Sequence, residues 1–286
     1  MDETLRNLIR RSDVVAVATM RRSSITKVGE TEFLRAETEV REVLKGITPF
    51  NKALPVDIRT AGKETPILDT GRDYVLFLKL LADGRATLVA GVRPLAVPST
   101  DSDKFLRELR ESVALYERNP SDRELKGQVF EMLASGIPFF SGDATRLALE
   151  IPEWTQAELD QLITVLASET GQRTITGDER VNAEAVIAKV GEPVRIAAFA
   201  RTEYRLGAGD GIYYGLLERK NGSQDAVLGD LLNDPDDEIK IGGLRLAGLL
   251  RRADIIDSFE KRSAATNSHA VRSAIIDARA LVGRDF

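Results

Sequence analysis

The sequence predicts a two-part β + α protein, with a small five-stranded β-barrel in residues 1–98 and an all-α domain of repeated helices in residues 99–286. Two observations support this. Up to about Pro98 the apolar residues recur with a period of two, and turn residues separate short runs. From about Asp101 onward the period is helical, and several helical segments resemble one another.

The first two strands are predicted from contrasting patterns. Val14–Ala18 is an uninterrupted apolar run, which is typical of a buried strand. Leu34–Arg41 alternates apolar or small residues with charged ones, as a half-buried strand does. The alternation breaks at Val43 and Leu44, which are both apolar. We therefore expect a β-bulge there, followed by a turn at Gly46.

Three further strands complete the predicted barrel. Alternation over Val56–Thr60 gives the third strand. Tyr74–Leu81 is apolar on both faces and is the best candidate for the central strand. Asp83-Gly84 then signals a hairpin turn, and a partner strand begins at Ala86. Five strands in about 90 residues favour a small closed or partly closed barrel.

Helical spacing and capping patterns define the second part. Apolar residues at helical intervals predict a helix over residues 101–118, capped by Asp101 or Ser102. Ser121 and Thr155 each precede a glutamate by three residues, which predicts two capping boxes. Further helices are expected at about residues 178–190, 193–204, 212–219, 223–232, 236–252, 255–265 and 268–282.

Some of these helices form a weak internal repeat. Asp236–Leu250 and Ser268–Val282 align at an offset of 32, with a β-branched residue followed by a base near the start of each. Gly191–Thr202 is a third copy and Gly142–Ile151 a weaker fourth one. A single repeat of this kind cannot bury its apolar face alone, so several must stack.

The segment "NDPDDEIKIGGLRLAGLL" (Asn233–Leu250), with its echo "NSHAVRSAIIDARALV" (Asn267–Val282), resembles HEAT-like helical repeats. Those repeats often carry an Asp-Pro turn, which Asp234-Pro235 matches. Both segments also have a β-branched residue followed by a base, and small residues mixed with leucine or isoleucine. The resemblance is good over residues 233–282 and loose over 101–232. It implies a stack of helical hairpins and says almost nothing about chemistry.

The first part resembles the bacterial relatives of the netrin and tissue-inhibitor-of-metalloproteinase modules. The matching stretches are Ser12–Val15, Val40–Gly46 ("VREVLKG") and Leu68–Lys79 ("LDTGRDYVLFLK"), within about residues 8–97. The resemblance implies an OB-like five-stranded barrel, usually outside the cytoplasm. Inhibitors of that group place an amino-terminal cysteine over a protease zinc. This chain has no cysteine, so that mode of inhibition does not carry over.

Composition excludes several functional classes. The net charge of −5 and the isoelectric point of about 5.3 argue against non-specific binding of nucleic acid. The absence of cysteine excludes disulfides and thiolate metal sites. The single histidine, His269, excludes a metal site with two histidines and is interpreted as an exposed residue in the first turn of a helix.

No apolar run is long enough to span a membrane. The charged first residues are not a signal peptide as they stand. We expect a periplasmic or extracellular location if a signal peptide has been removed, and a cytoplasmic one otherwise.

Two segments resemble ligand-binding loops but are interpreted as ordinary connections between helices. "LGAGDG" (Leu206–Gly211) lacks the GK[ST] ending of a phosphate loop and is interpreted as a flexible connector. Asn233–Glu238 carries four carboxylates but lacks the EF-hand spacing, so a helix start is preferred to a calcium site.

The predicted function is non-enzymatic binding of another protein or a peptide, by a scaffold that uses the helical-repeat surface and the OB-like module. No catalytic residue, metal or cofactor is predicted, and the oligomeric state is not fixed by sequence. The alternatives are an enzyme or protease-inhibitor-like protein that uses the barrel mouth, and a structural subunit of a larger assembly.

The predicted contact residues are four arginines and a tryptophan. The arginines occupy polar positions of the repeat helices, and charge reversal at two of them is expected to weaken partner binding without unfolding. Trp154 precedes the Thr155 cap, where it is either a hydrophobic staple or an interface anchor. The arginines are Arg245, Arg251, Arg252 and Arg279.

Overall fold

The computed structural model of the chain describes residues 3–28, 31–47, 53–59, 68–82, 85–89, 93–263 and 268–284. Two compact units make up the chain: Met1–Gln128, called the barrel unit, and Val129–Phe286, called the helical unit. The chain changes from strand to helix between Ala96 and Ser102, whereas the compact units divide after Gln128. The domain boundary at residue 98 therefore stays a prediction.

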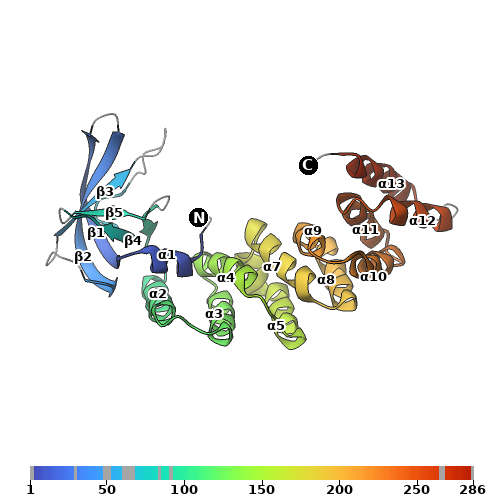
Figure 1. The fold of residues 1–286 in the computed structure, drawn as a ribbon, viewed down its shortest axis with the longest axis horizontal. Coiled ribbons are helices and arrows are strands. Elements are labelled where there is room, and N and C mark those ends of the chain that lie inside the picture. The colour runs from blue at the N-terminus through green and yellow to red at the C-terminus, as the bar shows by residue number, and fades with distance from the viewer. Residues whose placement is uncertain are drawn as a thin grey trace. The chain divides into compact units, whose positions relative to one another are not determined.

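The described strands form a closed five-stranded barrel (Figure 1). The ring runs β1-β2-β3-β5-β4 and closes through pairing of β4 with β1. All neighbours are antiparallel except β3 and β5, which are parallel. The strands are β1 (Val14–Val28), β2 (Thr31–Lys45), β3 (Ala53–Arg59), β4 (Asp73–Leu80), β5 (Ala86–Leu88) and the short β6 (Leu95–Ala96), which pairs with β4.

The barrel interior is filled by the alternating apolar residues that the sequence pattern picks out. Val14, Ala16 and Ala18 of β1 share this core with Leu34 and Ala36 of β2. β4 pairs with β1, β5 and β6, as expected of a central strand, and is buried on both faces from Tyr74 to Leu78. Its outer face is covered by α1 (Leu5–Arg11), which was not predicted from the sequence.

The predicted bulge and turn are present. Val15 pairs with Lys45 and Ala16 with Val43, which leaves Leu44 as the extra residue of the bulge. Gly46 has φ +77°, and a Cβ atom there would lie 2.1 Å from the backbone oxygen of Asp13. Only glycine meets both conditions, so the ending of "VREVLKG" is fixed by the fold.

The fourth and fifth strands pair as a hairpin. Leu78 pairs with Leu88 and Leu80 with Ala86. The predicted turn residues Asp83-Gly84, like Thr60 of the third strand, lie outside the described residues.

From Ser102 onward the described chain consists mainly of helices. Their bounds are α2 (Ser102–Glu117), α3 (Asp122–Ala134), α4 (Pro138–Glu150), α5 (Gln156–Ala167), α6 (Glu169–Thr174), α7 (Gly177–Val190), α8 (Pro193–Arg205), α9 (Asp210–Leu217), α10 (Asn221–Leu232), α11 (Asp237–Leu249), α12 (Ala253–Ser263) and α13 (His269–Val282). The predicted fold class, a barrel followed by an all-α region, is confirmed.

The helical unit is built from two layers (Figure 1). In one layer α4 packs on α7, α7 packs on α9, and α11 packs on α13. In the other layer α8 packs on α10, and α10 contacts α12. α11 also contacts α8, α10 and α12, so it is the helix around which the carboxyl-terminal part is assembled.

Local capping chemistry explains where several helices begin. Thr155 and Glu158 form the predicted capping box at α5. Ser121 and Glu124 exchange the same pair of hydrogen bonds at α3. Of the two residues predicted to cap α2, Asp101 occupies the cap position, but it has φ +59° and its side chain makes no capping hydrogen bond.

Candidate functional site

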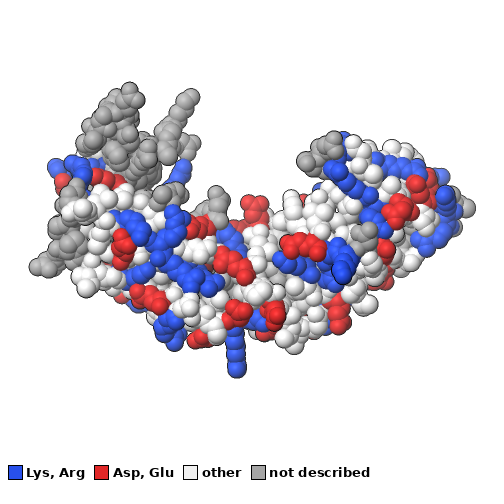
Figure 2. Space-filling view, in the orientation of Figure 1, with Lys and Arg blue, Asp and Glu red and all other residues white. Residues whose placement is uncertain are grey.

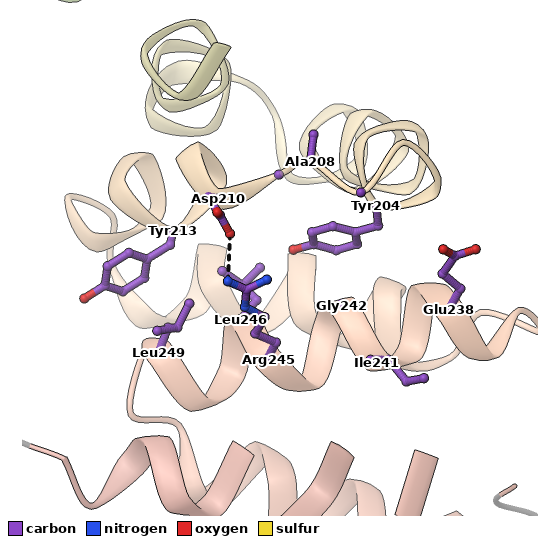
Figure 3. A pocket seen from close by; sticks show the side chains of 12 residues that line it. Tyr204, Ala208, Asp210, Tyr213, Glu238, Ile241, Gly242, Arg245, Leu246 and Leu249 are labelled. Atoms are coloured by element: carbon purple, nitrogen blue, oxygen red, sulfur yellow. Dashed lines mark ion pairs between the residues drawn. The ribbon is translucent and has the colours of Figure 1, made fainter. Parts of the chain in front are cut away.

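Two adjacent cavities flank α11 in the helical unit and are together called the groove. Figure 3 shows the first of them. The first, of about 220 Å³, lies between α11 and the segment from the end of α8 to α9. The second, of about 370 Å³, lies between α11 and α13. Ile241 and Arg245, one turn apart on α11, line both cavities, so this face of α11 is the ridge between them.

Close helix packing on either side creates this space. At Gly211 and Gly215 a Cβ atom would lie 2.1 Å and 2.3 Å from backbone oxygens of α7, so α9 is held tightly against α7. At Gly248 a Cβ atom would lie 2.7 Å from the Ala278 oxygen, which brings α13 close to α11. α9 therefore packs closely on α7 and α11 on α13, and the first cavity lies between α9 and α11.

Tyr204, near the end of α8, forms part of the cavity wall. Its ring lies against Gly242 of α11 and Gly209, where Cβ atoms would come within 2.3 Å and 2.6 Å of ring carbons. Desolvation by the surrounding protein raises the pKa of the Tyr204 hydroxyl above its usual value, and the carboxyl of Glu184 adds to the effect. The hydroxyl therefore stays protonated and can donate a hydrogen bond at neutral pH.

The outward face of α9 is apolar and aromatic. Tyr213, Tyr214 and Leu217 fall on one side of the helix, opposite the glycines that contact α7. Tyr214 is 56% exposed and Leu217 is 50% exposed. The rings of Tyr213 and Tyr214 are in contact, with centroids 5.2 Å apart. Tyr213 lines the first cavity across from Leu249, so this apolar face continues into the groove (Figure 3).

The charges around the groove are mixed. Arg245 and Asp210 form an ion pair of 3.0 Å across its mouth, with side chains 65% and 64% exposed. Glu238 lines the first cavity, and Asp277 and Arg284 line the second. Figure 2 likewise shows basic and acidic side chains interspersed over the face in view. The site suits a ligand with both apolar and polar groups rather than a polyanion.

A buried carboxyl group holds the loop at one end of the groove. Glu184 of α7 accepts hydrogen bonds from the backbone N–H groups of Gly209, at 3.1 Å, and Gly211, at 2.8 Å. Burial raises the pKa of Glu184 to about 8, helped by a hydrogen bond with Glu203 of α8. Glu203 in turn receives two hydrogen bonds from Arg180, at 2.6 Å and 2.7 Å.

The segment expected to be a connector, Leu206–Gly211, joins α8 to α9, and its last two residues already belong to α9. The Ala208 N–H donates to the Glu203 backbone oxygen at 2.9 Å, and Glu184 holds the next two glycines. The two glycine N–H groups at the start of α9 are therefore satisfied by a carboxyl group of the protein itself, in the place that a bound phosphate takes in a phosphate loop.

Of the predicted arginines, Arg245 lies in the groove. Arg279 lies elsewhere on α13 and donates to Asp257, at 2.6 Å, and Glu260, at 2.7 Å, both on α12. The structure therefore does not bring these two arginines into one site.

The other two arginines follow the end of α11 rather than lying within it. Arg251 has φ +58° and donates to the backbone oxygen of Arg284 at 3.1 Å. Arg252, whose side chain is only 12% exposed, pairs with Asp225 and makes two hydrogen bonds with Asp254, at 3.0 Å and 2.7 Å. Both arginines take part in local structure, and a partner contact by either one stays a prediction.

Trp154 is buried away from the groove. Its indole N–H donates to the Ala148 oxygen at 3.3 Å, and its ring meets Phe130 edge to face, with centroids 6.1 Å apart. These contacts give the residue a packing role. A partner contact by Trp154 also stays a prediction.

The remaining polar motifs have structural partners. His269 is exposed at the start of α13. In the acidic turn, Asp234 pairs with Arg201 at 2.6 Å, and Asp236 caps α11. No metal-binding group of three or more histidine, aspartate or glutamate residues occurs in the described part of the chain. No helix among the described residues is long and apolar enough to cross a membrane.

Sequence reasoning missed Tyr204 and most of the other groove residues. One signal was available: Tyr213, Tyr214 and Leu217 recur at helical spacing as an apolar stripe, and two glycines lie on the other side of the helix. That stripe resembles a core-facing side, and only the packing of the glycines shows that it faces outward.

Comparison with known proteins identifies no relative. No family model matches the chain, and neither a curated protein nor a solved structure matches it. The function is therefore inferred from the residues of the groove.

Proposed function

We propose that the chain is a non-enzymatic binding protein that holds a peptide or a segment of another protein on α9, α11 and α13. The observation that carries this proposal is the exposed face of α9. Tyr213, Tyr214 and Leu217 lie beside a groove that already has an apolar lining from Ile241 and Leu249. Exposed aromatic residues next to a cavity are typical of protein interaction sites.

The polar groups of the groove suit a peptide. A peptide offers backbone donors and acceptors together with apolar side chains, and the groove carries both kinds of partner. The exposed Arg245–Asp210 pair contributes only about 0–1 kcal/mol to stability. A ligand can therefore replace Asp210 as the partner of Arg245 at little cost to the stability of the fold.

We also infer that the barrel is OB-like and of the netrin and tissue-inhibitor-of-metalloproteinase type. In support, β1 pairs with both β2 and β4, and β3 pairs with β5 in parallel. The motif Val40–Gly46 supports the same assignment through its bulge and its obligatory glycine.

We infer further that the helices are HEAT-like repeats. Support comes from the two layers and from the basic residue that recurs near the start of the repeated helices. Arg195 of α8 pairs with Asp160 of α5, the helix of an earlier repeat, at 2.6 Å. The alternative roles, an enzyme or protease-inhibitor-like protein at the barrel mouth or a structural subunit, have no such observation among the described residues and stay predictions.

A panning experiment tests the binding proposal. A random-peptide phage library is selected on the full chain, and the enriched peptides are titrated against purified variants by fluorescence anisotropy. Tyr214→Ser and Arg245→Glu are expected to weaken binding by about tenfold or more. Val194→Ser, which removes an even more exposed apolar residue on α8, is the matched control and is expected to leave affinity unchanged. Equal binding to all variants, or no enrichment, would overturn the proposal.

A further inference from the structure

The Leu206–Gly211 loop, here meaning the connection between α8 and α9 together with the first two residues of α9, is held by one buried group. Gly207, Ala208, Gly209 and Asp210 line the first cavity, so the loop is a wall of the groove. The loop is tied to α7 by the two hydrogen bonds that Glu184 accepts. Whatever changes the charge of Glu184 therefore acts directly on the geometry of the groove.

A count of charges shows that this network needs a proton. Glu184 and Glu203 have side chains that are 1% and 2% exposed, and they share a single guanidinium, that of Arg180. Arg180 makes its two short hydrogen bonds with Glu203 and lies 3.7 Å from Glu184. If both carboxyl groups were ionised, the second buried negative charge would be stabilised only by the N–H groups of Gly209 and Gly211 at the start of α9, because Arg180 is engaged by Glu203, and this is unfavourable.

The neighbouring charged groups do not supply the missing compensation. Tyr204 lies near Glu184 and is neutral, while Asp210 and Arg245, which also influence Tyr204, pair with each other at the exposed mouth. No hydrogen bond or ion pair joins Glu184 to the other charged groups of α7 or of its neighbours α4 and α5 within the described ranges. Those groups are Asp178, Glu179 and Lys189 on α7, Asp143, Arg146 and Glu150 on α4, and Glu158 and Asp160 on α5.

We propose that the two carboxyl groups form a proton-dependent latch on the groove, in which one proton shared by Glu184 and Glu203 keeps the Leu206–Gly211 loop closed. Loss of that proton favours an open loop, in which Glu184 is hydrated and the groove has lost a wall. The consequence for peptide affinity rests on the proposed function, whereas the latch itself does not.

The sign of the effect follows from proton linkage. The pKa of Glu184 is raised to about 8 while the loop is closed, and it returns to the ordinary value of about 4.3 once the side chain is hydrated. Between these values the open loop binds fewer protons than the closed loop. The open fraction therefore rises with pH, by at most about tenfold per pH unit, and levels off above pH 8.

Hydrogen–deuterium exchange of the full chain, read by mass spectrometry between pH 5 and pH 9, tests the latch without any ligand. After correction for the intrinsic exchange rate, protection of the segment 206–212 is expected to fall by up to about tenfold per pH unit below pH 8. The segment 224–232 of α10 provides the internal reference. Protection of 206–212 that does not depend on pH relative to this reference would overturn the proposal.

Two variants assign the effect to the buried pair. Glu184→Gln keeps a hydrogen-bond donor toward Glu203 but cannot ionise, so its protection profile is expected to be flat. Glu203→Gln leaves one carboxyl group for Arg180 and is expected to lose the slope as well, which keeps the test open if the first variant does not fold. Glu238→Gln, a change at an exposed glutamate of the groove, is expected to retain the wild-type slope. A wild-type slope in either buried variant would contradict the latch.

Peptide binding then separates the latch from the binding role. A peptide selected on the wild-type chain is expected to lose affinity from pH 6 to pH 8 with wild type and not with Glu184→Gln. A sloping exchange profile without any selected peptide would support the latch and refute the proposed function. Peptide binding together with a flat exchange profile would support the proposed function and refute the latch.

Discussion

The ring of Tyr204 lies directly on the backbone of Gly242, at a place where a Cβ atom would come 2.3 Å from the ring. This contact joins the last turn of α8 to the middle of α11 and forms the back of the first cavity. It also explains why α11 tolerates a glycine in its interior, at a cost of about 1 kcal/mol in helix propensity.

Gly242→Ala is expected to destabilise the chain by about 1–3 kcal/mol, because the new methyl group must displace the Tyr204 ring. Gly229→Ala in α10 is the matched control, since nothing lies within 4 Å of its Cβ position. That variant is expected to gain about 0.5–1 kcal/mol from helix propensity. Denaturant unfolding measures both, and stabilisation by Gly242→Ala would contradict the close contact.

A second pair of glycines separates backbone strain from steric overlap. Gly71 has φ +84° with nothing within 4 Å of its Cβ position, so Gly71→Ala is expected to cost about 1–2 kcal/mol of strain alone. Gly46→Ala adds an overlap with the Asp13 oxygen and is expected to lower the melting temperature clearly further. Equal melting temperatures for the two variants would show that the turn at Gly46 can relax.

The barrel unit contains a buried carboxylate between two arginines. Asp57 accepts a hydrogen bond from Arg35 at 2.9 Å and another from Arg85 at 2.7 Å. Asp57→Ala is expected to cost about 2–4 kcal/mol, because both guanidinium groups lose their shared partner. The matched control is Asp69→Ala, which removes an exposed partner of Arg72 and is expected to cost under about 1 kcal/mol. Urea unfolding that finds equal costs would refute the buried role.

Charge reversal distinguishes two of the arginines predicted from the sequence. Arg245→Glu breaks one exposed ion pair and is expected to change the free energy of unfolding by about 1 kcal/mol or less. Arg252→Glu would place a negative charge between Asp225 and Asp254, so it is expected to destabilise by about 2 kcal/mol or more. Calorimetry checks the order, and a tolerated Arg252→Glu would mean that these pairs contribute little.

The stability of the folded chain is expected to decrease both as the pH rises and as it falls. The folded pKa of Glu184 is raised to about 8, so the stabilisation it gives is present in acid and is lost as pH rises from about 4.3 to about 8. The pKa values of Asp13 and Asp254 are lowered, chiefly by hydrogen bonds from Lys79 and Arg252. Their contributions are lost as pH falls below about 4.

Comparison of wild type with Glu184→Gln isolates the alkaline side of that profile. Between about pH 4.3 and pH 8, the difference between their free energies of unfolding is expected to shrink by up to about 1.4 kcal/mol per pH unit. Glu184→Gln also loses one glycine hydrogen bond, and this loss is the same at every pH. Chemical unfolding at several pH values measures it. A constant difference would show that Glu184 is ionised in the folded protein.

The sequence by itself determined most of the elements and their order, although not α1, α6 or β6. Period-two alternation located the barrel strands, and the adjacent apolar pair Val43 and Leu44 predicted the bulge before Gly46. The capping boxes at Ser121 and Thr155 located two helix starts to the residue. Such features depend on neighbours within a few positions along the chain, which a single sequence contains in full.

Only the tertiary structure decided the groove and the charge of its buried pair. The same pattern of apolar residues on α9 would serve a buried helix, and only the approach of its glycines to α7 turns Tyr214 outward. Likewise Glu184 looks like any helical glutamate until folding removes it from water and places Glu203 beside it. Exposure and pKa depend on what lies next to a group in space, and those neighbours come from distant parts of the chain.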